Sequence, residues 1–198
     1  MAWSFDPEPN ELTRRVVEYS PATLFLFFLL VQQLPGAATF GLGTLATFVW
    51  IYSLGIELNA LVSQEHRQDA VRFVRALTFM ATWVLVLGFA MFLGWVANLA
   101  ALVSGSELLQ GSVEMARVVL FLLALPIILA FLAAYLRVLT FVSRAYFDAE
   151  SPKPRPRQHV ALFAVMGLFG KPLWLCYIHL RTQEFLAELG AAGAIVRR

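Results

Sequence analysis

Cysteine, histidine and charge are all scarce in this sequence. Of its 198 residues, one is cysteine, three are histidine and only 14% are charged. Cys176 has no second cysteine for an internal disulfide or a cysteine metal site, and its apolar neighbours favour an inert, packed thiol. The net charge of +2, without a basic cluster on one face, excludes the footprint of a nucleic-acid-binding protein.

Catalytic motifs are also missing. The sequence contains no HExxH, no set of histidine boxes, no P-loop and no Gly-x-Ser-x-Gly, so we do not expect an enzyme. The segment Ser104–Glu107 only superficially resembles a serine nucleophile loop, since no histidine is positioned to activate it. No cofactor follows from the sequence. His179, the one histidine within an apolar run, is a candidate pigment or metal ligand, although a hydrogen-bonded histidine beside aromatic residues is the favoured interpretation.

Apolar residues are abundant instead. Hydrophobic side chains make up 60% of the chain, and the mean hydropathy is +0.72. Soluble domains are nearer half apolar and a quarter charged. We therefore predict an all-α integral membrane protein with one transmembrane domain over residues 21–180, whose first partner is the lipid bilayer.

The apolar segments predict three long transmembrane helices and two shorter or broken ones, with four or five crossings. The first segment is short, about 20 Å, and the long ones exceed the bilayer, so they must tilt or protrude. Lys171 and Pro172 interrupt the last segment, which either crosses as a broken helix, as we favour, or dips into the membrane and lies at its surface. The helices are expected at 21–34, 37–62, 73–103, 117–147 and 160–180.

Basic residues set the expected orientation. Loops 63–72 and 144–159 are rich in arginine and lysine, whereas loop 104–116 carries only acidic charges, which places the first two in the cytoplasm, as in a bacterial inner membrane. Residues 1–20 form a cytoplasmic tail, and 181–198 an amphipathic tail on the membrane surface. Five crossings would put the C-terminal arginines outside, which conflicts with this rule.

Two ionisable residues lie within apolar segments. Charges inside a membrane are costly and are usually paired or functional. Glu57 and Arg137 fall at matching depths near the cytoplasmic ends of their segments, so we predict a polar intramembrane pair, with a structural role favoured over ion or proton transfer. Lys171 and Pro172 form a second candidate site at the broken helix.

Small residues and a basic linker suggest contacts with other chains. Small side chains at helical spacing let helices approach closely in lipid and predict an antiparallel hairpin of the two long segments. The positions are Ala90, Gly94, Ala97, Ala101, Ala130 and Ala134. The stretch 151–157 alternates proline with Lys153, Arg155 and Arg157, which suits lipid headgroups or an acidic partner.

These features favour a non-catalytic accessory or scaffold subunit of a larger membrane complex, with other membrane subunits as partners. One alternative is a small transporter or channel that uses Glu57 and Arg137. A second is a pigment- or quinone-associated subunit of a photosynthetic or respiratory complex. The sequence identifies neither a partner nor a substrate.

Overall fold

Seven helices make up the part of the chain that the computed structural model describes, which is residues 8–33, 37–61, 67–105, 107–150 and 156–191. No strand occurs within these ranges. The helices are α1 (Glu11–Glu18), α2 (Pro21–Gln33), α3 (Ala37–Leu61), α4 (Arg67–Ser104), α5 (Glu107–Glu150), α6 (Arg157–Phe169) and α7 (Lys171–Ala191).

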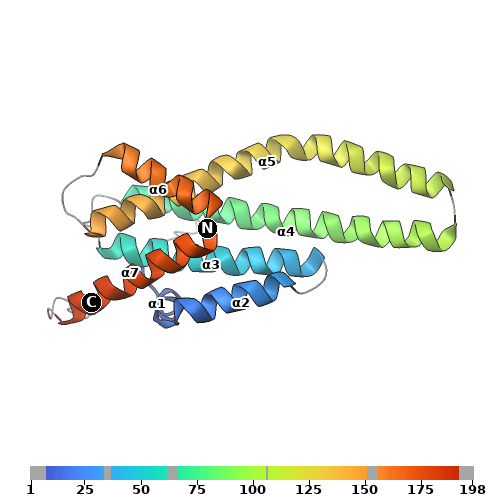
Figure 1. The fold of residues 1–198 in the computed structure, drawn as a ribbon. Coiled ribbons are helices and arrows are strands. Elements are labelled where there is room, and N and C mark those ends of the chain that lie inside the picture. The colour runs from blue at the N-terminus through green and yellow to red at the C-terminus, as the bar shows by residue number, and fades with distance from the viewer. Residues whose placement is uncertain (1–7, 34–36, 62–66, 106, 151–155, 192–198) are drawn as a thin grey trace, which may run out of the picture.

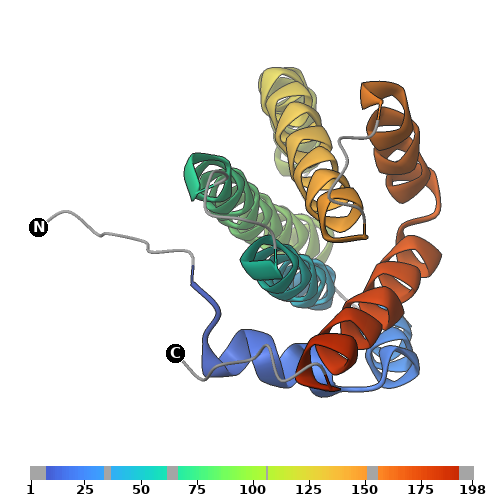
Figure 2. The ribbon, with the colours of Figure 1, turned by 90° about the vertical axis from the view of Figure 1, so that its left-hand side faces the viewer.

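The helices form three hairpins that share one end of the molecule (Figure 1). We call this the basal end: α3 ends there, α4 begins there, and α5 and α7 both finish there. The α4–α5 hairpin is the longest and projects well beyond the α2–α3 hairpin, while α6 and α7 lie against the basal half. Helix α1 is seen end-on in Figure 1 and from the side in Figure 2, so it runs across the long helices at the basal end.

The prediction of an acidic loop over residues 104–116 is wrong, because most of these residues are helical. Helix α4 continues to Ser104 and α5 begins at Glu107, with a tight turn between them. Gly105 has φ +63, a left-handed conformation that glycine adopts without steric cost, so little more than this turn reverses the chain. The basic loops are also shorter than expected, because α4 begins at Arg67 and α5 runs to Glu150. Polar residues therefore continue these helices beyond the ends of their apolar segments.

The last apolar segment is two helices rather than one broken helix. Helix α6 ends at Phe169, the N–H of Gly170 bonds the carbonyl of Met166 at 2.8 Å, and α7 begins at Lys171. Pro172 has no N–H, which suits the first turn of a new helix but not the middle of one. Figure 1 shows α7 returning to the basal end, and its last turns include residues 181–191 of the surface tail expected at 181–198. Residues 192–198 lie outside the described ranges.

The hydrophobic core fills the basal half of the molecule. The ring of Phe73 on α4 stacks on Phe141 of α5 with centroids 4.4 Å apart. A Cβ added to Gly55 of α3 would lie 2.5 Å from the Phe73 ring, so glycine is needed for this close approach. Fully buried residues from four helices complete the core, including Ile51, Leu54, Met80, Leu139, Val142, Leu175 and Ile178.

Among the described residues, three helices are long and apolar enough to cross a membrane, which confirms the all-helical class and the three long segments expected from the sequence. The segments concerned are Gly43–Leu61, Asp69–Ser104 and Leu125–Glu150. Within α3 more than half of the segment is buried by other helices, whereas the α4 and α5 segments are mostly uncovered.

Candidate functional site

Glu57 is held by helix α1. Its carboxylate accepts a hydrogen bond from the Thr13 hydroxyl at 2.6 Å, and both side chains are buried. Asn10 caps α1: its side chain accepts from the Thr13 N–H at 2.9 Å, and its own N–H donates to the Thr13 oxygen at 3.0 Å. Thr13 therefore takes part both in the N-terminal cap of α1 and in the contact between α1 and α3. Its hydroxyl supplies a hydrogen bond to a buried carboxylate that would otherwise lack one.

His179 joins α1 to α3 and α7. Trp50 of α3 donates its indole N–H to Nδ1 of His179 at 2.9 Å. Nε2 must then carry the proton, and it faces the carbonyls of Val17 and Tyr19, at 3.0 and 2.9 Å, where α1 ends. Gln183 donates to the Val17 carbonyl at 2.7 Å. Two side chains of α7 thus form hydrogen bonds with carbonyls at the C-terminal end of α1, where the helix itself supplies no partner.

This geometry bears on the possible role of His179 as a pigment ligand. The side chain is fully buried, and both ring nitrogens already take part in hydrogen bonds. Axial coordination would require one of these bonds to break. Within the described residues, moreover, no group of three or more His, Cys, Asp or Glu side chains is placed to hold a metal ion.

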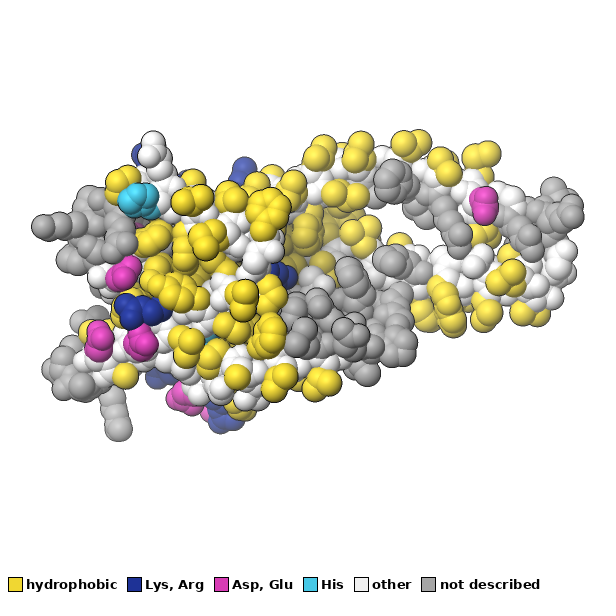
Figure 3. Space-filling view, viewed as in Figure 1, with side chains coloured by type: hydrophobic (Ala, Val, Ile, Leu, Met, Phe, Trp, Pro, Cys, Tyr) yellow, Lys and Arg dark blue, Asp and Glu magenta, His cyan; other side chains and the backbone are white. Residues whose placement is uncertain are grey.

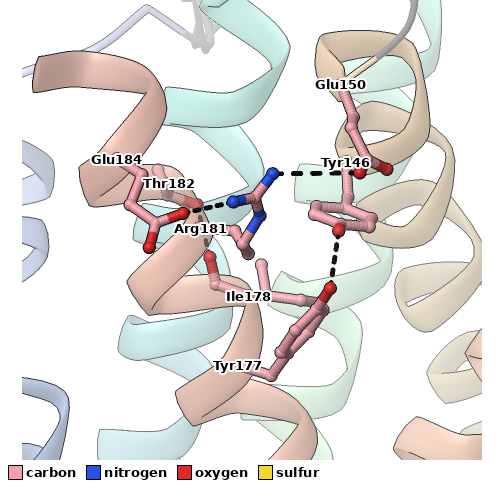
Figure 4. Close-up of polar contacts among 7 residues, drawn as sticks. All are labelled: Tyr146, Glu150, Tyr177, Ile178, Arg181, Thr182 and Glu184. Carbon is pink, nitrogen blue, oxygen red and sulfur yellow. Dashed lines mark hydrogen bonds and ion pairs between the residues drawn. The ribbon is translucent and has the colours of Figure 1, made fainter. Parts of the chain in front are cut away.

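A second polar cluster joins α5 to α7 at the basal end (Figure 4). The hydroxyls of Tyr146 and Tyr177 are 3.0 Å apart. One turn farther along α7, Arg181 pairs with Glu184 on its own helix and lies 3.8 Å from Glu150 of α5. Beneath these groups the Tyr146 ring stacks on Phe163 of α6, with centroids 5.2 Å apart. The cluster is a clamp that holds α6 and α7 against α5.

Lys171 lies at the turn of the α6–α7 hairpin, where it faces α5. Its Nζ is 5.7 Å from the centroid of the Tyr135 ring, within range of a cation–π interaction. Pro172 follows it in the first turn of α7 and is half-buried. The Tyr135 hydroxyl and the Trp174 indole N–H are buried, and within the described part of the chain neither has a hydrogen-bond partner.

Glu57 and Arg137 are not brought together as an ion pair. Glu57 bonds Thr13, whereas Arg137 is exposed on the surface of α5.

The small residues expected to pack between helices differ in their exposure. Ala101 and Ala134 are buried, but Ala90, Ala97 and Ala130 are exposed. The antiparallel hairpin is present (Figure 1). Figure 1 shows α5, which contains Pro126, bowing away from α4, and none of the described atoms would lie within 4 Å of a Cβ at Gly94.

The basic linker is described only in part. Lys153 and Arg155 lie outside the described ranges. Arg157 is the exposed first residue of α6.

Several residues of these clusters escape prediction from the sequence. Thr13 carries a usable local signal, since Asn10 three residues before it forms a capping pattern for a helix start. Trp50, Tyr146 and Gln183 carry none, because an aromatic or amide residue in an apolar helix shows no sign of its distant partner.

In its described part the chain has seven helices, three of them apolar and of spanning length. These are features of a helical membrane protein and are compatible with several crossings. Comparison with protein-family models, with curated proteins and with solved structures finds no match for the chain.

Proposed function

We propose that this protein is a non-catalytic accessory subunit of a membrane complex, and that it binds helices of other subunits through the distal half of its α4–α5 hairpin. The observation that carries the proposal is the apolar surface of that half, which no other part of the described chain covers. Its exposed side chains include Phe89, Phe92, Trp95, Leu99, Leu102, Met115, Val118 and Leu122. Contiguous apolar surface on this scale marks contact with lipid or with another protein.

The shape of the hairpin favours a protein partner over lipid alone. Figure 3 shows an opening between the two arms just beyond the basal half. A Cβ added to Gly88 or Gly94 would meet no atom of the described residues within 4 Å, so these residues leave space beside the two positions. Glycine in a membrane helix lets a neighbouring backbone approach closely. A helix of another subunit would gain such contacts on α4.

The buried polar groups support a structural role. Glu57, His179 and Tyr146 each bond a residue on another helix, and each of these bonds joins elements of the bundle. Groups engaged in this way stabilise the fold and are not poised to bind a substrate. The transporter and pigment alternatives find no comparable support in the described residues.

The test is the composition of the purified protein. The full chain, tagged and extracted from its own membranes in mild detergent, should migrate as a complex on native gels, with partners identified by mass spectrometry. Leu99→Ser with Leu102→Ser should weaken that association, whereas Leu26→Ser, at a similarly exposed site on α2, should leave it intact. A lone monomer, or equal loss in both variants, would overturn the proposal.

A further inference from the structure

Two exposed arginines lie at almost the same level of the α4–α5 hairpin. The stacked rings of Phe73 and Phe141 show which residues of the two helices are side by side. Arg75 lies two residues from Phe73 toward the tip, and Arg137 lies four residues from Phe141 in the same direction. At 1.5 Å per residue, the two α-carbons are displaced from the stacked pair by about 3 and 6 Å.

The chain beyond these arginines has the length of a hydrocarbon core. Residues 118–136 of α5 contain no charged side chain and cover about 28 Å, close to the roughly 30 Å thickness of the core. Residues 76–104 of α4 are uncharged. Measured from Arg75, a slab of that thickness ends at about Trp95, whose side chain is exposed. Tryptophan is enriched at such boundaries, so both arms agree on where the slab ends.

We propose that Arg75 and Arg137 bind lipid phosphate groups of one leaflet and so set the depth of the hairpin in the bilayer. The hydrocarbon core then covers α4 from residue 76 to about Trp95 and α5 over residues 118–136. An exposed guanidinium beside apolar surface is costly in hydrocarbon but forms paired hydrogen bonds with a phosphate at the headgroup level.

This depth changes the setting of the other polar groups. Glu57 lies two residues from Gly55, which contacts Phe73, and it lies on the basal side. The carboxylate is therefore level with the headgroups and is covered by α1, not immersed in hydrocarbon. At the other end, residues 96–105 and 107–117 emerge from the slab and form a tip about 15 Å high. That tip includes the exposed Leu99 and Leu102, which would face a partner outside the hydrocarbon if the proposed function holds.

The experiment measures depth along α4 in the full chain without any partner, so its outcome is separate from that of the subunit proposal. In a Cys176→Ser background, which removes the only cysteine, single cysteines carry nitroxide labels in phosphatidylcholine–phosphatidylglycerol vesicles. Accessibility to oxygen and to a water-soluble nickel complex gives the depth of each label. The labelled positions are Phe79, Val86, Leu93 and Leu102, all exposed on α4.

We expect the greatest depth at Val86 and exposure to water at Leu102. In Arg75→Gln with Arg137→Gln, the label at Phe79 should move deeper into the hydrocarbon, and vesicles of a phosphate-free glycolipid should produce the same shift with the unchanged arginines. Arg72→Gln with Arg144→Gln, at exposed arginines nearer the basal end, is the matched control and should leave the profile unchanged.

Two results would overturn the proposal. A label at Leu102 as deep as that at Val86 would show that the slab lies nearer the tip. An unchanged profile, either after substitution of both arginines or in glycolipid vesicles, would show that phosphate does not anchor the hairpin. If the double variant fails to fold, the comparison of lipids still decides the point, because it uses the unchanged arginines.

Discussion

The bond between Thr13 and Glu57 predicts that a single hydroxyl controls the docking of α1. In Thr13→Val the side chain keeps its shape but loses its hydroxyl, and the Glu57 carboxylate stays buried without that donor. A hydrogen bond to a charged group contributes about 1.5–3 kcal/mol. Since about 1.4 kcal/mol is tenfold in an equilibrium constant, the undocked state of α1 should become about 10- to 100-fold more populated.

The rate of cleavage by trypsin measures the population of the undocked state of α1. Arg14 and Arg15 are exposed residues within α1, but a protease needs the local helix to open before it can cut the backbone. When opening and closing are fast, the cleavage rate follows the population of the open state. Thr13→Val should therefore raise the rate of cleavage after these arginines by about 10- to 100-fold in detergent, measured by mass spectrometry of the released N-terminal peptide.

Two further variants make the test specific. Thr13→Ser keeps the hydroxyl and should be cleaved at close to the original rate. Adding Glu57→Leu to Thr13→Val should slow cleavage again, because replacing both partners by apolar groups leaves no unsatisfied carboxylate. If Thr13→Val raises the rate by less than about twofold, or if the second substitution brings no recovery, the bond does not hold α1 in place.

Packing and pH give two more predictions. Gly167→Ala would place a Cβ 2.9 Å from the Trp174 ring and should lower the free energy of unfolding by about 1–3 kcal/mol. Gly94→Ala, where no described atom lies within 4 Å of the new Cβ, should be neutral or slightly stabilising. Thermal unfolding in detergent, followed by circular dichroism, compares the two variants. Burial lowers the pKa of His179, which lies outside the three candidate spans, so below the ordinary value of about 6.5 the unfolded state binds the proton more readily and stability should fall as the pH falls. Trp50→Phe removes the N–H that opposes protonation of His179 at Nδ1, so the variant should lose less stability in acid. If the stability of the original protein and of the variant depends on pH in the same way, this bond does not cause the acid sensitivity.

Local patterns were sufficient for some of the structure. The three long apolar segments, the hairpin of the two longest and a break near Gly170 all follow from composition and from residues that favour or end helices. Boundaries were less predictable, because the described part of the α4–α5 turn is a single glycine in a left-handed conformation and the flanking polar residues are compatible with helix. The reversal of α7 was equally hidden, since a broken segment can continue onward or turn back with the same residues.

What the sequence by itself determined is that the chain is helical and apolar over lengths that can cross a membrane, because those properties add up residue by residue. Only the tertiary structure decided the partners of its polar groups. Glu57 bonds a residue 44 positions away, and His179 reaches the end of α1 across 162 positions. Such contacts depend on how hairpins pack against each other, and no local pattern of hydropathy carries that information. Arg137, which was expected to pair with Glu57, is instead exposed on the outer surface of the α4–α5 hairpin.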